Sequence, residues 1–301
     1  MSDTNWFAAR AKINLALHVT GRRDDGYHLI ETIAVFADIG DRIGIRPAEA
    51  DRFSIEGPEA AALAQEDEAH NLVVRARDMV RGIAGEHGIA APPVDIVLDK
   101  HLPAGSGIGG GSADAAAALA GLTMHWGADA AAEAIRGKAV GLGADVPMCL
   151  ASRPLVASGV GEELRPLANM PALALVLANP RRHVSTPTVF SALAEKDNPP
   201  IPLGTAAGLK SARDWTAWLA EQTRNDLQGP SVALTPEIGD CLAALQATGP
   251  LLARMSGSGA TCFGVHADMD AARHAASHLL RDKPDWWITT TQTGPSREEQ
   301  T

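Results

Sequence analysis

A run of glycines near the middle of the chain constrains its fold and chemistry more than any other feature. Residues 102–114 have the sequence LPAGSGIGGGSAD, with glycine at 105, 107, 109, 110 and 111, and we expect an alanine-rich helix to open at Ser112. Glycines lack the Cβ atoms that would keep an anion away from the backbone, so successive N–H groups can point into one concavity. The helix N-terminus adds unpaired N–H donors and the positive end of a macrodipole. No acidic residue lies between Asp99 and Asp114, so the segment predicts a phosphate-binding loop for a nucleotide.

The same glycines allow other interpretations. Gly105, Gly107 and Gly110 match the dinucleotide pattern G-x-G-x-x-G, and Asp129 lies about where that motif places its ribose-binding acid. The context argues against this motif, because residues that include Leu102, Pro103 and Ala104 separate the preceding strand from the first glycine, and because Asp129 lies in an alanine-rich stretch with helical spacing. The P-loop pattern fails because no lysine follows the glycines. A purely structural glycine turn stays open as an alternative, although five glycines are more than a turn requires.

Composition limits the class of protein. The 301 residues are 46% hydrophobic and 21% charged, which is enough for two domains with a core in each. The apolar stretches are too short to span a membrane and MSDTNWFAAR lacks the apolar core of a signal peptide, so we expect a cytoplasmic protein without a membrane partner. A net charge of -10 argues against nucleic-acid binding. The scattered Cys149, Cys241 and Cys262 predict reduced, buried thiols rather than disulfides or a zinc site.

The apolar pattern predicts alternating strands and helices without an internal repeat. In the first half we expect strands near 7–19, 28–36, 41–46, 52–56 and 94–99, and helices near 71–86, 112–126 and 130–140. In the second half we expect several short strands within 154–166, single strands near 172–178 and 286–291, a hairpin at 251–265, and helices near 186–195, 211–223, 236–247 and 268–281. We divide the chain into an N-terminal domain at 1–155, a C-terminal domain at 156–291 and a disordered tail at 292–301.

The first expected strand alternates between apolar and polar positions. Every odd position from 7 to 19 is apolar, which places on the other face four polar residues: Arg10, Lys12, Asn14 and His18. A solvated strand face is the simplest explanation. Lysine is rare in this chain, however, and the strand leads directly into GRRDDGYH, which holds the only tyrosine, Tyr27, beside His28. This sparing use favours a functional role for the polar face.

Two further motifs consist largely of small residues. In GLGADVP, at 141–147, Asp145 lies between a glycine pair and a proline. An aspartate there is either the N-cap of a helix or a carboxylate directed at a substrate hydroxyl, and both interpretations stay open on this motif alone. RMSGSGA, at 254–260, lies between two apolar runs and is predicted to be a hairpin turn rather than a site.

Together these segments resemble the GHMP small-molecule kinases. AKINLALHVTGRRDDGYH, LPAGSGIGGGSADAA, GLGADVP and RMSGSGA follow one another in the family's order over nearly the whole chain. The glycine loop is shared across the superfamily, whereas AKINLALHV with DGYH, and GADVP, are similar to members that act on a cytidine diphosphate-linked methylerythritol. The resemblance implies an α+β, two-domain GHMP kinase fold. It implies a ribosomal S5 domain 2-like N-terminal domain, a ferredoxin-like C-terminal domain and an active site in the cleft between them.

The resemblance also implies residue roles in moving the γ-phosphoryl group of ATP to the 2-hydroxyl of that small-molecule substrate, in the non-mevalonate route to isoprenoid precursors. Asp145 would be the catalytic base and Lys12 its partner near the reacting hydroxyl. Tyr27 would stack on the cytosine and His28 would hydrogen-bond its edge. The substrate side would be completed by Asn14, Thr186 and Phe190. The triphosphate would be held by Pro103, Gly105, Ser106, Gly107, Gly109, Gly110, Gly111 and Ser112. Asn71 would reach the adenine or only cap the helix that follows it.

These roles agree with the chemistry of phosphoryl transfer. The transition state is loose and spreads charge over the equatorial oxygens, so fixed N–H donors and a cation matter more than covalent chemistry. Lys12 would stabilise that charge and Asp145 would accept or orient the hydroxyl proton. Mg²⁺ is expected with ATP. The sequence shows no cluster of carboxylates that must bind the metal. A loop hydroxyl such as that of Ser112, together with water and phosphate oxygens, would suffice.

Other classes of function remain as alternatives. Another GHMP kinase, acting on homoserine, mevalonate or a sugar, would not require the Tyr27-His28 pair. A dinucleotide-dependent oxidoreductase is disfavoured because its fold needs a second strand that ends at the ribose-binding acid, whereas the stretch around Asp129 has helical spacing. A nucleotide-binding regulatory module would keep the glycines but would need neither Lys12 nor Asp145.

Overall fold

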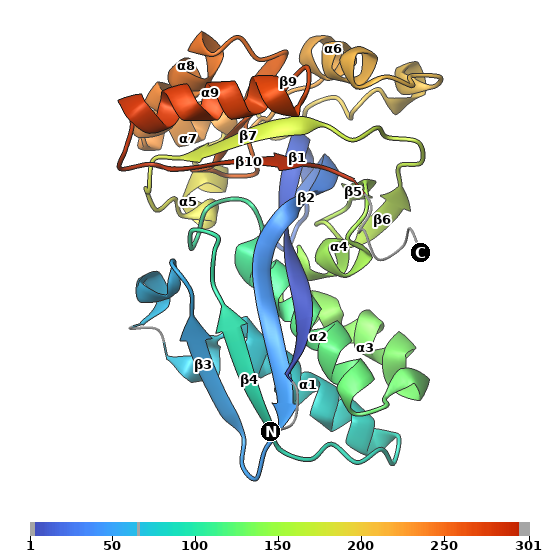
Figure 1. Cartoon of the computed structure of the whole chain (residues 1–301). Helices are drawn as coiled ribbons and strands as arrows, with labels where there is room; N and C mark the ends of the chain where they lie inside the picture. The colour runs from blue at the N-terminus through green and yellow to red at the C-terminus, as the bar shows by residue number, and fades with distance from the viewer. Residues whose placement is uncertain (1–3, 65–66, 295–301) are drawn as a thin grey trace. The chain divides into compact units, whose positions relative to one another are not determined.

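The computed structural model describes residues 4–64 and 67–294, and it divides into two compact units (Figure 1). Unit 1 consists of Met1–Ala11, Ile39–Ala104 and Gly109–Ala151. Unit 2 consists of Lys12–Asp38, Gly105–Ile108 and Ser152–Thr301. Both units are discontinuous in sequence, so a single boundary at residue 155 does not describe them, and the proposed domain limits stay a prediction. No helix among the described residues has the length and apolar character needed to cross a membrane.

Two long strands, β1 (Asn5–Arg22) and β2 (His28–Pro47), contribute residues to both units. We expected two strands, at 28–36 and 41–46, where the structure has the single strand β2. The expected break falls at Gly40, but this glycine continues the strand, because a Cβ there would lie 2.0 Å from the backbone oxygen of Ala9. Gly40 thus permits a close approach of two backbones rather than a turn.

Unit 1 contains a sheet with the order β3-β4-β2. β3 (Arg52–Glu56) pairs parallel with β4 (Val94–Asp99), which pairs antiparallel with the end of β2. Its helices are α1 (Leu72–Glu86), α2 (Gly110–His125), α3 (Ala132–Lys138) and α4 (Val146–Ala151), with 3-10 turns at Ala60–Leu63, Glu68–His70, Asp129–Ala131 and Ala139–Gly141.

Three expectations for the helices of unit 1 need correction. α2 begins at Gly110, two residues before Ser112. The helix expected at 130–140 is reduced to α3 flanked by 3-10 turns, because i→i+3 bonds close both of its ends and Gly137 lowers helix propensity inside it. α4 was not expected as a helix.

The alanine-rich helix α2 lies directly on the sheet, since a Cβ at Gly121 would meet Phe7 at 2.7 Å.

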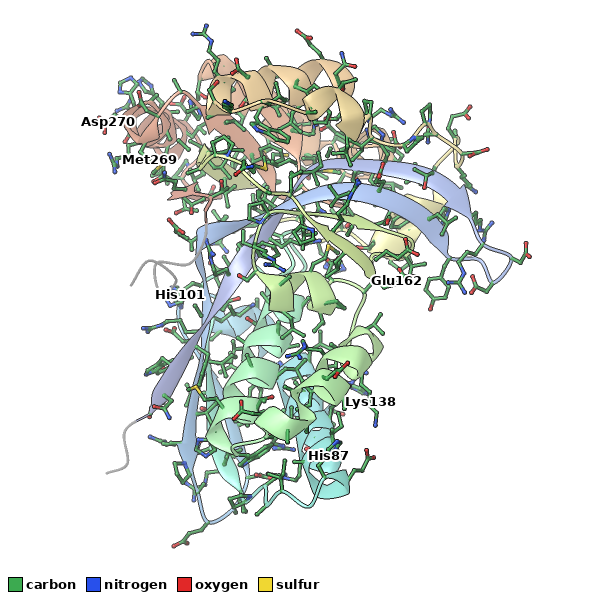
Figure 2. The ribbon with its side chains drawn as sticks, turned by 90° about the vertical axis from the view of Figure 1, so that its right-hand side faces the viewer. His87, His101, Lys138, Glu162, Met269 and Asp270 are labelled. Atoms are coloured by element: carbon green, nitrogen blue, oxygen red, sulfur yellow. The ribbon has the colours of Figure 1, made fainter. Side chains whose placement is uncertain are left out.

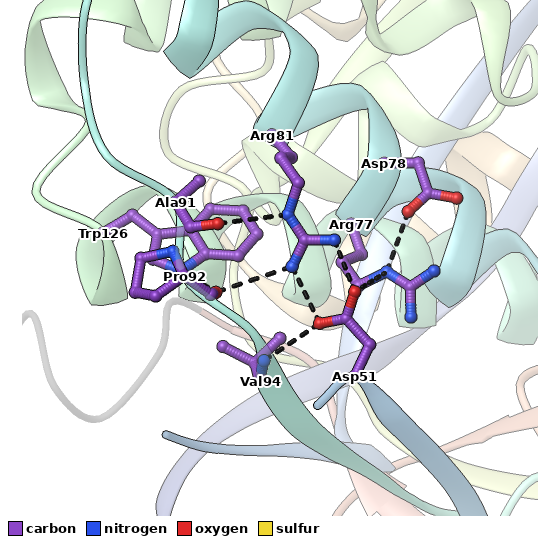
Figure 3. Close-up of polar contacts among 8 residues, drawn as sticks. All are labelled: Asp51, Arg77, Asp78, Arg81, Ala91, Pro92, Val94 and Trp126. Atoms are coloured by element: carbon purple, nitrogen blue, oxygen red, sulfur yellow. Dashed lines mark hydrogen bonds and ion pairs between the residues drawn. The ribbon is translucent and has the colours of Figure 1, made fainter. Parts of the chain in front are cut away.

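An ion pair fixes α1 to the edge of this sheet (Figure 3). Arg81 donates to both carboxylate oxygens of Asp51, at 2.5 and 2.8 Å, and this bond lowers the pKa of Asp51 to about 2. Asp51 also accepts from the N–H of Val94 at 3.0 Å, while Arg81 lies 5.2 Å over the ring of Trp126. One arginine on α1 thereby joins Asp51, which bonds to the start of β4, to Trp126, which follows α2.

Unit 2 contains a second sheet with the strand order β10-β7-β9-β8, all antiparallel. In chain order its strands are β7 (Ala174–Asn179), β8 (Leu252–Met255), β9 (Cys262–His266) and β10 (Trp287–Gln292). Helix α8 (Glu237–Ala247) precedes β8, and α9 (Met269–Asp282), whose first residues are labelled in Figure 2, joins β9 to β10. This spatial order, 4-1-3-2, with helices packed on one core, is the expected ferredoxin-like arrangement.

The remaining elements of unit 2 extend these predictions. β5 (Leu155–Ser158) pairs with β2 and β6 (Glu163–Pro166) with β5, which confirms the short strands expected at 154–166. α6 (Ala212–Gln222) is confirmed, α5 (Thr186–Ser191) is shorter than expected, and a 3-10 turn lies at Leu203–Ala206. α7 (Gln228–Leu234) was not predicted. It holds a Gly-Pro pair, which the helix tolerates because Pro230 lies in the first turn, where no N–H donor is needed.

The end of the chain is ordered further than we expected. β10 ends at Gln292, and Thr293 donates its N–H to Leu173 O at 3.0 Å and accepts the N–H of Leu173 through Oγ1 at 2.9 Å. Residues 292–294 therefore belong to unit 2 rather than to the tail. The rest of the expected tail, 295–301, lies outside the described residues.

A buried arginine connects three elements of unit 2. The guanidinium of Arg254, on β8, donates to Leu15 O at 2.7 Å in β1 and to Leu219 O at 3.1 Å in α6. It also donates to Oγ1 and O of Thr223, both at 2.9 Å. Burial lowers the pKa of Arg254 to about 10, so the group stays charged near neutral pH and holds the middle of β1 against β8.

Candidate active site

The polar face of β1 in unit 2 is buried rather than solvated. Lys12 is 4% exposed and Asn14 is 2% exposed, and His18 is also buried. The simple explanation of a solvated strand face is therefore wrong for these three residues. His18 has a structural role, because its Nε2 accepts the N–H of Arg224 at 3.2 Å and its Nδ1 donates to Pro199 O at 2.9 Å. Lys12 and Asn14 remain the candidates for chemistry.

The backbone of β1 runs beside the first part of the glycine loop. The N–H of Lys12 donates to Ile108 O at 2.9 Å. The backbone N–H of Asn14 donates to Ser256 Oγ at 3.1 Å, and its side-chain Nδ2 donates to Thr32 Oγ1 at 2.8 Å. Asn14 Oδ1 is buried and has no hydrogen-bond partner among the described residues. This acceptor is available for a donor that the protein itself does not supply.

Residues 105–108 of the glycine loop pack against the RMSGSGA segment within unit 2. Ser256 Oγ donates to Gly107 O at 3.0 Å, and the N–H of Thr261 donates to Ser106 O at 3.0 Å. Gly107 has φ +76°, and a Cβ there would lie 2.5 Å from Gly259 O. RMSGSGA forms the predicted hairpin connection between β8 and β9, and its Ser256 also bonds to the glycine loop.

The second part of the loop begins α2 in unit 1. Gly109 is its N-cap, with φ +68°, and the first turn follows from Gly110. Gly111 is exposed, and a Cβ there would make only an ordinary contact, 3.8 Å from Leu72 Cδ1. This half of the loop thus consists of a left-handed glycine followed by a helix N-terminus, the arrangement expected of an anion-binding loop.

The GLGADVP motif lies beside this helix start. A Cβ at Gly143 would come 3.8 Å from Ser112 Oγ, and α4 packs against α2. Asp145 is half-buried, immediately precedes α4, and accepts the N–H of Cys149 at 3.0 Å through its backbone oxygen. Asp145 thus occupies the N-cap position, and an N-cap and a substrate-directed carboxylate are both compatible with this position.

The residues expected on the substrate side are partly brought together in unit 2. The rings of His28 and Phe190 stack, with centroids 4.8 Å apart and planes at 24°. Burial, with smaller contributions from Arg22 and Lys196, lowers the pKa of His28, and its buried Nε2 has no partner among the described residues. Thr186 Oγ1 lies 2.8 Å from Ser258 Oγ.

Tyr27 does not join this group. It is 65% exposed in the turn before β2, where Gly26 has φ +92°, and its ring contacts no ring of a described residue. The stacking role expected of Tyr27 stays a prediction, whereas His28 and Phe190 already form an aromatic face.

Asn71 caps α1 and also lines a cavity of unit 1. Its Oδ1 accepts the N–H of Val73 at 2.9 Å, so the structural role that we considered is confirmed. The cavity has a volume of about 430 Å³ and is lined by β3 and by the two 3-10 turns before α1, including the apolar side chains of Phe53, Ile55 and Leu63. An apolar cavity with a few polar groups suits a flat heteroaromatic ring.

Comparisons with known proteins define the class of this chain. The family described as GHMP kinases N terminal domain matches residues 71–153, and the family described as GHMP kinases C terminal matches residues 206–284. The chain belongs to the GHMP kinases. A 4-diphosphocytidyl-2-C-methyl-D-erythritol kinase from Agrobacterium fabrum (strain C58) is 53% identical over 286 residues, which cover 95% of this chain and 95% of the relative.

Solved structures agree with this assignment. A crystal structure of 4-(cytidine 5'-diphospho)-2C-methyl-D-erythritol kinase matches with a TM-score of 0.78 and 33% identity, over 97% of this chain and 100% of that one. A homoserine kinase from Cytophaga hutchinsonii matches with a TM-score of 0.70 at 18% identity, over 98% of this chain and 95% of that one. The second likeness concerns the fold alone.

The loop glycines differ in what a substitution would test. At Gly109 a side chain would be strained by the positive φ, so a Gly109 variant would report on folding as well as on phosphate binding. Gly111→Val adds a branched side chain at an open position on the first turn of α2. We expect this variant to fold normally and to raise the KM for ATP by roughly tenfold or more, because the side chain would occupy the space in front of the N–H groups.

The measurement is steady-state kinetics at varied ATP, with a thermal melt of each variant. Gly82→Val, on the open surface of α1, is the matched control for a valine placed in a helix. An ATP KM that changes equally in both variants would remove the first turn of α2 from the phosphate site.

Proposed function

We propose that this protein transfers the γ-phosphoryl group of ATP to the 2-hydroxyl of 4-diphosphocytidyl-2-C-methyl-D-erythritol, a step of the non-mevalonate route to isoprenoid precursors. The observation that carries this proposal is the 53% identity to a kinase of that name over 95% of both chains. Identity at this level over both halves of the chain favours one shared substrate rather than a shared fold alone. The cytoplasmic location expected from the sequence stays a prediction.

In the proposed mechanism Asp145 accepts the proton of the 2-hydroxyl as the oxygen attacks the γ-phosphorus. Lys12 stabilises the negative charge on the equatorial oxygens and on the attacking oxygen, a task that a cation with low exposure performs well because water screens it little. The N–H groups at the start of α2 hold the phosphates, and Asn14 supplies the unpartnered acceptor Oδ1 to a hydroxyl of the substrate.

Magnesium fits this site without a dedicated set of protein ligands. Among the described residues no group of three or more His, Cys, Asp or Glu side chains is placed to hold a metal ion. Mg²⁺ keeps much of its water and is commonly bound through phosphate oxygens. When bound, it neutralises charge on the transferred phosphoryl group, and Ser112, the first side-chain hydroxyl of α2, is the residue that we propose to contact it.

The site for the base is proposed at His28, Phe190 and Tyr27. His28→Ala should reduce the preference for the cytidyl over the uridyl substrate by roughly tenfold in kcat/KM. The physical reason is that exchange of a donor for an acceptor on the base edge leaves buried groups unpaired, at about 1–3 kcal/mol each. Competition between the two substrates in one reaction measures the ratio directly.

Tyr27→Ala is the matched control for this prediction. Loss of a stacking ring should weaken binding of both substrates by similar factors and leave their ratio unchanged. A His28→Ala enzyme that keeps the full cytidyl preference would contradict the proposed base contact.

The proposed function is tested by ADP release with a panel of acceptors. The panel contains the cytidyl substrate, homoserine, mevalonate and a hexose, each at the same concentration, with product identified by ³¹P NMR. We expect a new phosphomonoester signal with the cytidyl compound alone. Phosphorylation of homoserine or mevalonate instead would keep the family and overturn the proposed substrate, and no structural observation favours either.

A further inference from the structure

Three charged side chains of unit 1 form a buried cluster next to the glycine loop. Lys100, immediately after β4, donates from Nζ to Asp41 Oδ2 at 2.5 Å and to Asp114 Oδ2 at 2.8 Å. All three residues are buried. We call Asp41, Lys100 and Asp114 the buried triad. Neither the glycine motif nor the proposed roles of Lys12 and Asp145 account for it.

The buried triad contacts both ends of the glycine segment. At the beginning, Asp41 Oδ1 accepts the N–H groups of His101 at 2.5 Å and Leu102 at 2.8 Å. At the other end, Asp114 lies in the second turn of α2 and bonds to the same lysine. One centre therefore fixes where the segment departs from β4 and where it enters α2.

Gly110 shows how close the triad lies to the first turn of α2. A Cβ at Gly110 would be 3.2 Å from Lys100 Nζ and 3.8 Å from Asp41 Oδ2. The absence of a side chain at this position therefore admits the lysine. Gly110 matched a phosphate-binding pattern in the sequence, but in the structure it is the glycine that the buried triad requires.

The charge of the triad depends on one proton. Burial raises the pKa of Asp114 to about 8, and Asp41 adds to this effect while Lys100 opposes it. Asp41 and Lys100 are the charged groups that shift the pKa of Asp114. Helices α1 and α4 also pack against α2, but they contribute no charged group that shifts this pKa. With Asp114 protonated the triad carries one positive and one negative charge. With Asp114 ionised it carries a net negative charge beside the first turn of α2.

We propose that Asp41, Lys100 and Asp114 are positioning residues for the nucleotide phosphates, and that the glycine loop binds phosphate well only when the triad is electrically neutral. This inference rests on the proposed binding of ATP by the glycine loop. A neutral triad holds the N–H groups of the first turn in place without repelling the ligand. An ionised triad carries a net negative charge that repels the polyanionic ligand, and this repulsion is poorly screened because the triad is buried.

The test compares the wild-type protein with Asp114→Asn, which keeps the shape of the side chain and stays uncharged. Between pH 7 and pH 9 we expect the wild-type KM for ATP to rise roughly threefold to tenfold with little change in kcat. The KM of Asp114→Asn should stay constant over this range. Asp78→Asn, an exposed residue of α1, is the matched control and should follow the wild type. Parallel KM profiles for the wild type and Asp114→Asn would overturn the proposal.

A second measurement needs no nucleotide. Because the folded pKa of Asp114 is raised above its usual 3.8, the folded chain keeps a proton that the unfolded chain loses. The free energy of unfolding should therefore fall as pH rises from about 4 to about 8. Asp114→Asn should flatten this decline, as urea unfolding at several pH values would show. If Asp114→Asn leaves the dependence of the unfolding free energy on pH unchanged, the protonation of Asp114 in the folded protein is contradicted. Failure of the wild type to bind ATP, with the slope as expected, would instead overturn the proposed function.

Lys100→Met tests the positioning role from the other side. It removes the cation that both carboxylates share, and we expect the KM for ATP to rise at least tenfold at pH 7. If this variant does not fold, Lys100→Met combined with Asp41→Asn removes the uncompensated charge and provides the same comparison. An ATP KM within twofold of the wild type in a folded Lys100 variant would contradict the proposal.

Discussion

Asp145→Asn is expected to lower kcat by about 10²- to 10⁴-fold while the KM values for ATP and for the acceptor stay within about threefold. The amide keeps the size of the side chain and caps helices as well as the carboxylate does, so the start of α4 should be preserved. What it loses is the ability to accept the hydroxyl proton. Single-turnover kinetics at saturating substrates measures this loss directly.

The same variant separates the two interpretations of Asp145. If the residue only caps α4, kcat should stay near the wild-type value, and thermal stability should change slightly. Asp129→Asn, an exposed aspartate of the same unit, controls for the loss of one negative charge. Normal turnover by Asp145→Asn would contradict the proposed base and would direct attention to Lys12 and the phosphate contacts as the main sources of rate.

Arg254→Met is expected to lower the free energy of unfolding by about 3–5 kcal/mol, the largest stability effect that we predict. Methionine fills much of the volume of the arginine stem but donates no hydrogen bond. Four bonds from the guanidinium are lost, and the buried oxygens of Leu15, Leu219 and Thr223 lose a donor. Urea unfolding monitored by circular dichroism would show the midpoint shift at constant slope.

The matched control for this prediction is Arg213→Met, an exposed arginine on α6, which should change the unfolding free energy by less than about 0.5 kcal/mol. A similar small change in Arg254→Met would mean that water replaces the lost donor and that β1 and β8 are held together by their apolar contacts.

Much of the fold follows from local sequence pattern. The apolar stripe after Asn71, with its N-cap, predicts α1, and the apolar pattern after residue 172 predicts the strands of the second sheet, whose ferredoxin-like order was implied by the family resemblance. Of two failed predictions, one has a long-range cause and the other a local one. Gly40 continues β2 because a backbone passes close to it, and α7 tolerates a Gly-Pro pair because the proline lies in its first turn.

The site was predictable to the extent that its residues lie in short motifs. The glycine loop and Asp145 were found in this way, and the polar face of β1 was found from period-two alternation. Ser256 was not, because its contact with Gly107 joins residues 149 positions apart. The buried triad was missed for the same reason: its three members lie on different elements, and nothing near any of them in the sequence shows that they meet.

The four loop glycines at 107, 109, 110 and 111 would also leave different records in a saturation library scored separately for cellular abundance and for growth. Substitutions at Gly107 and Gly109 should reduce both scores, because the backbone itself cannot accept a side chain there. At Gly110 the loss of abundance should increase with the size of the new residue, since the obstacle is one lysine head group. Gly111 variants should stay abundant and still fail to grow. A single consecutive motif would thus divide into positions selected for folding and one selected for its ligand.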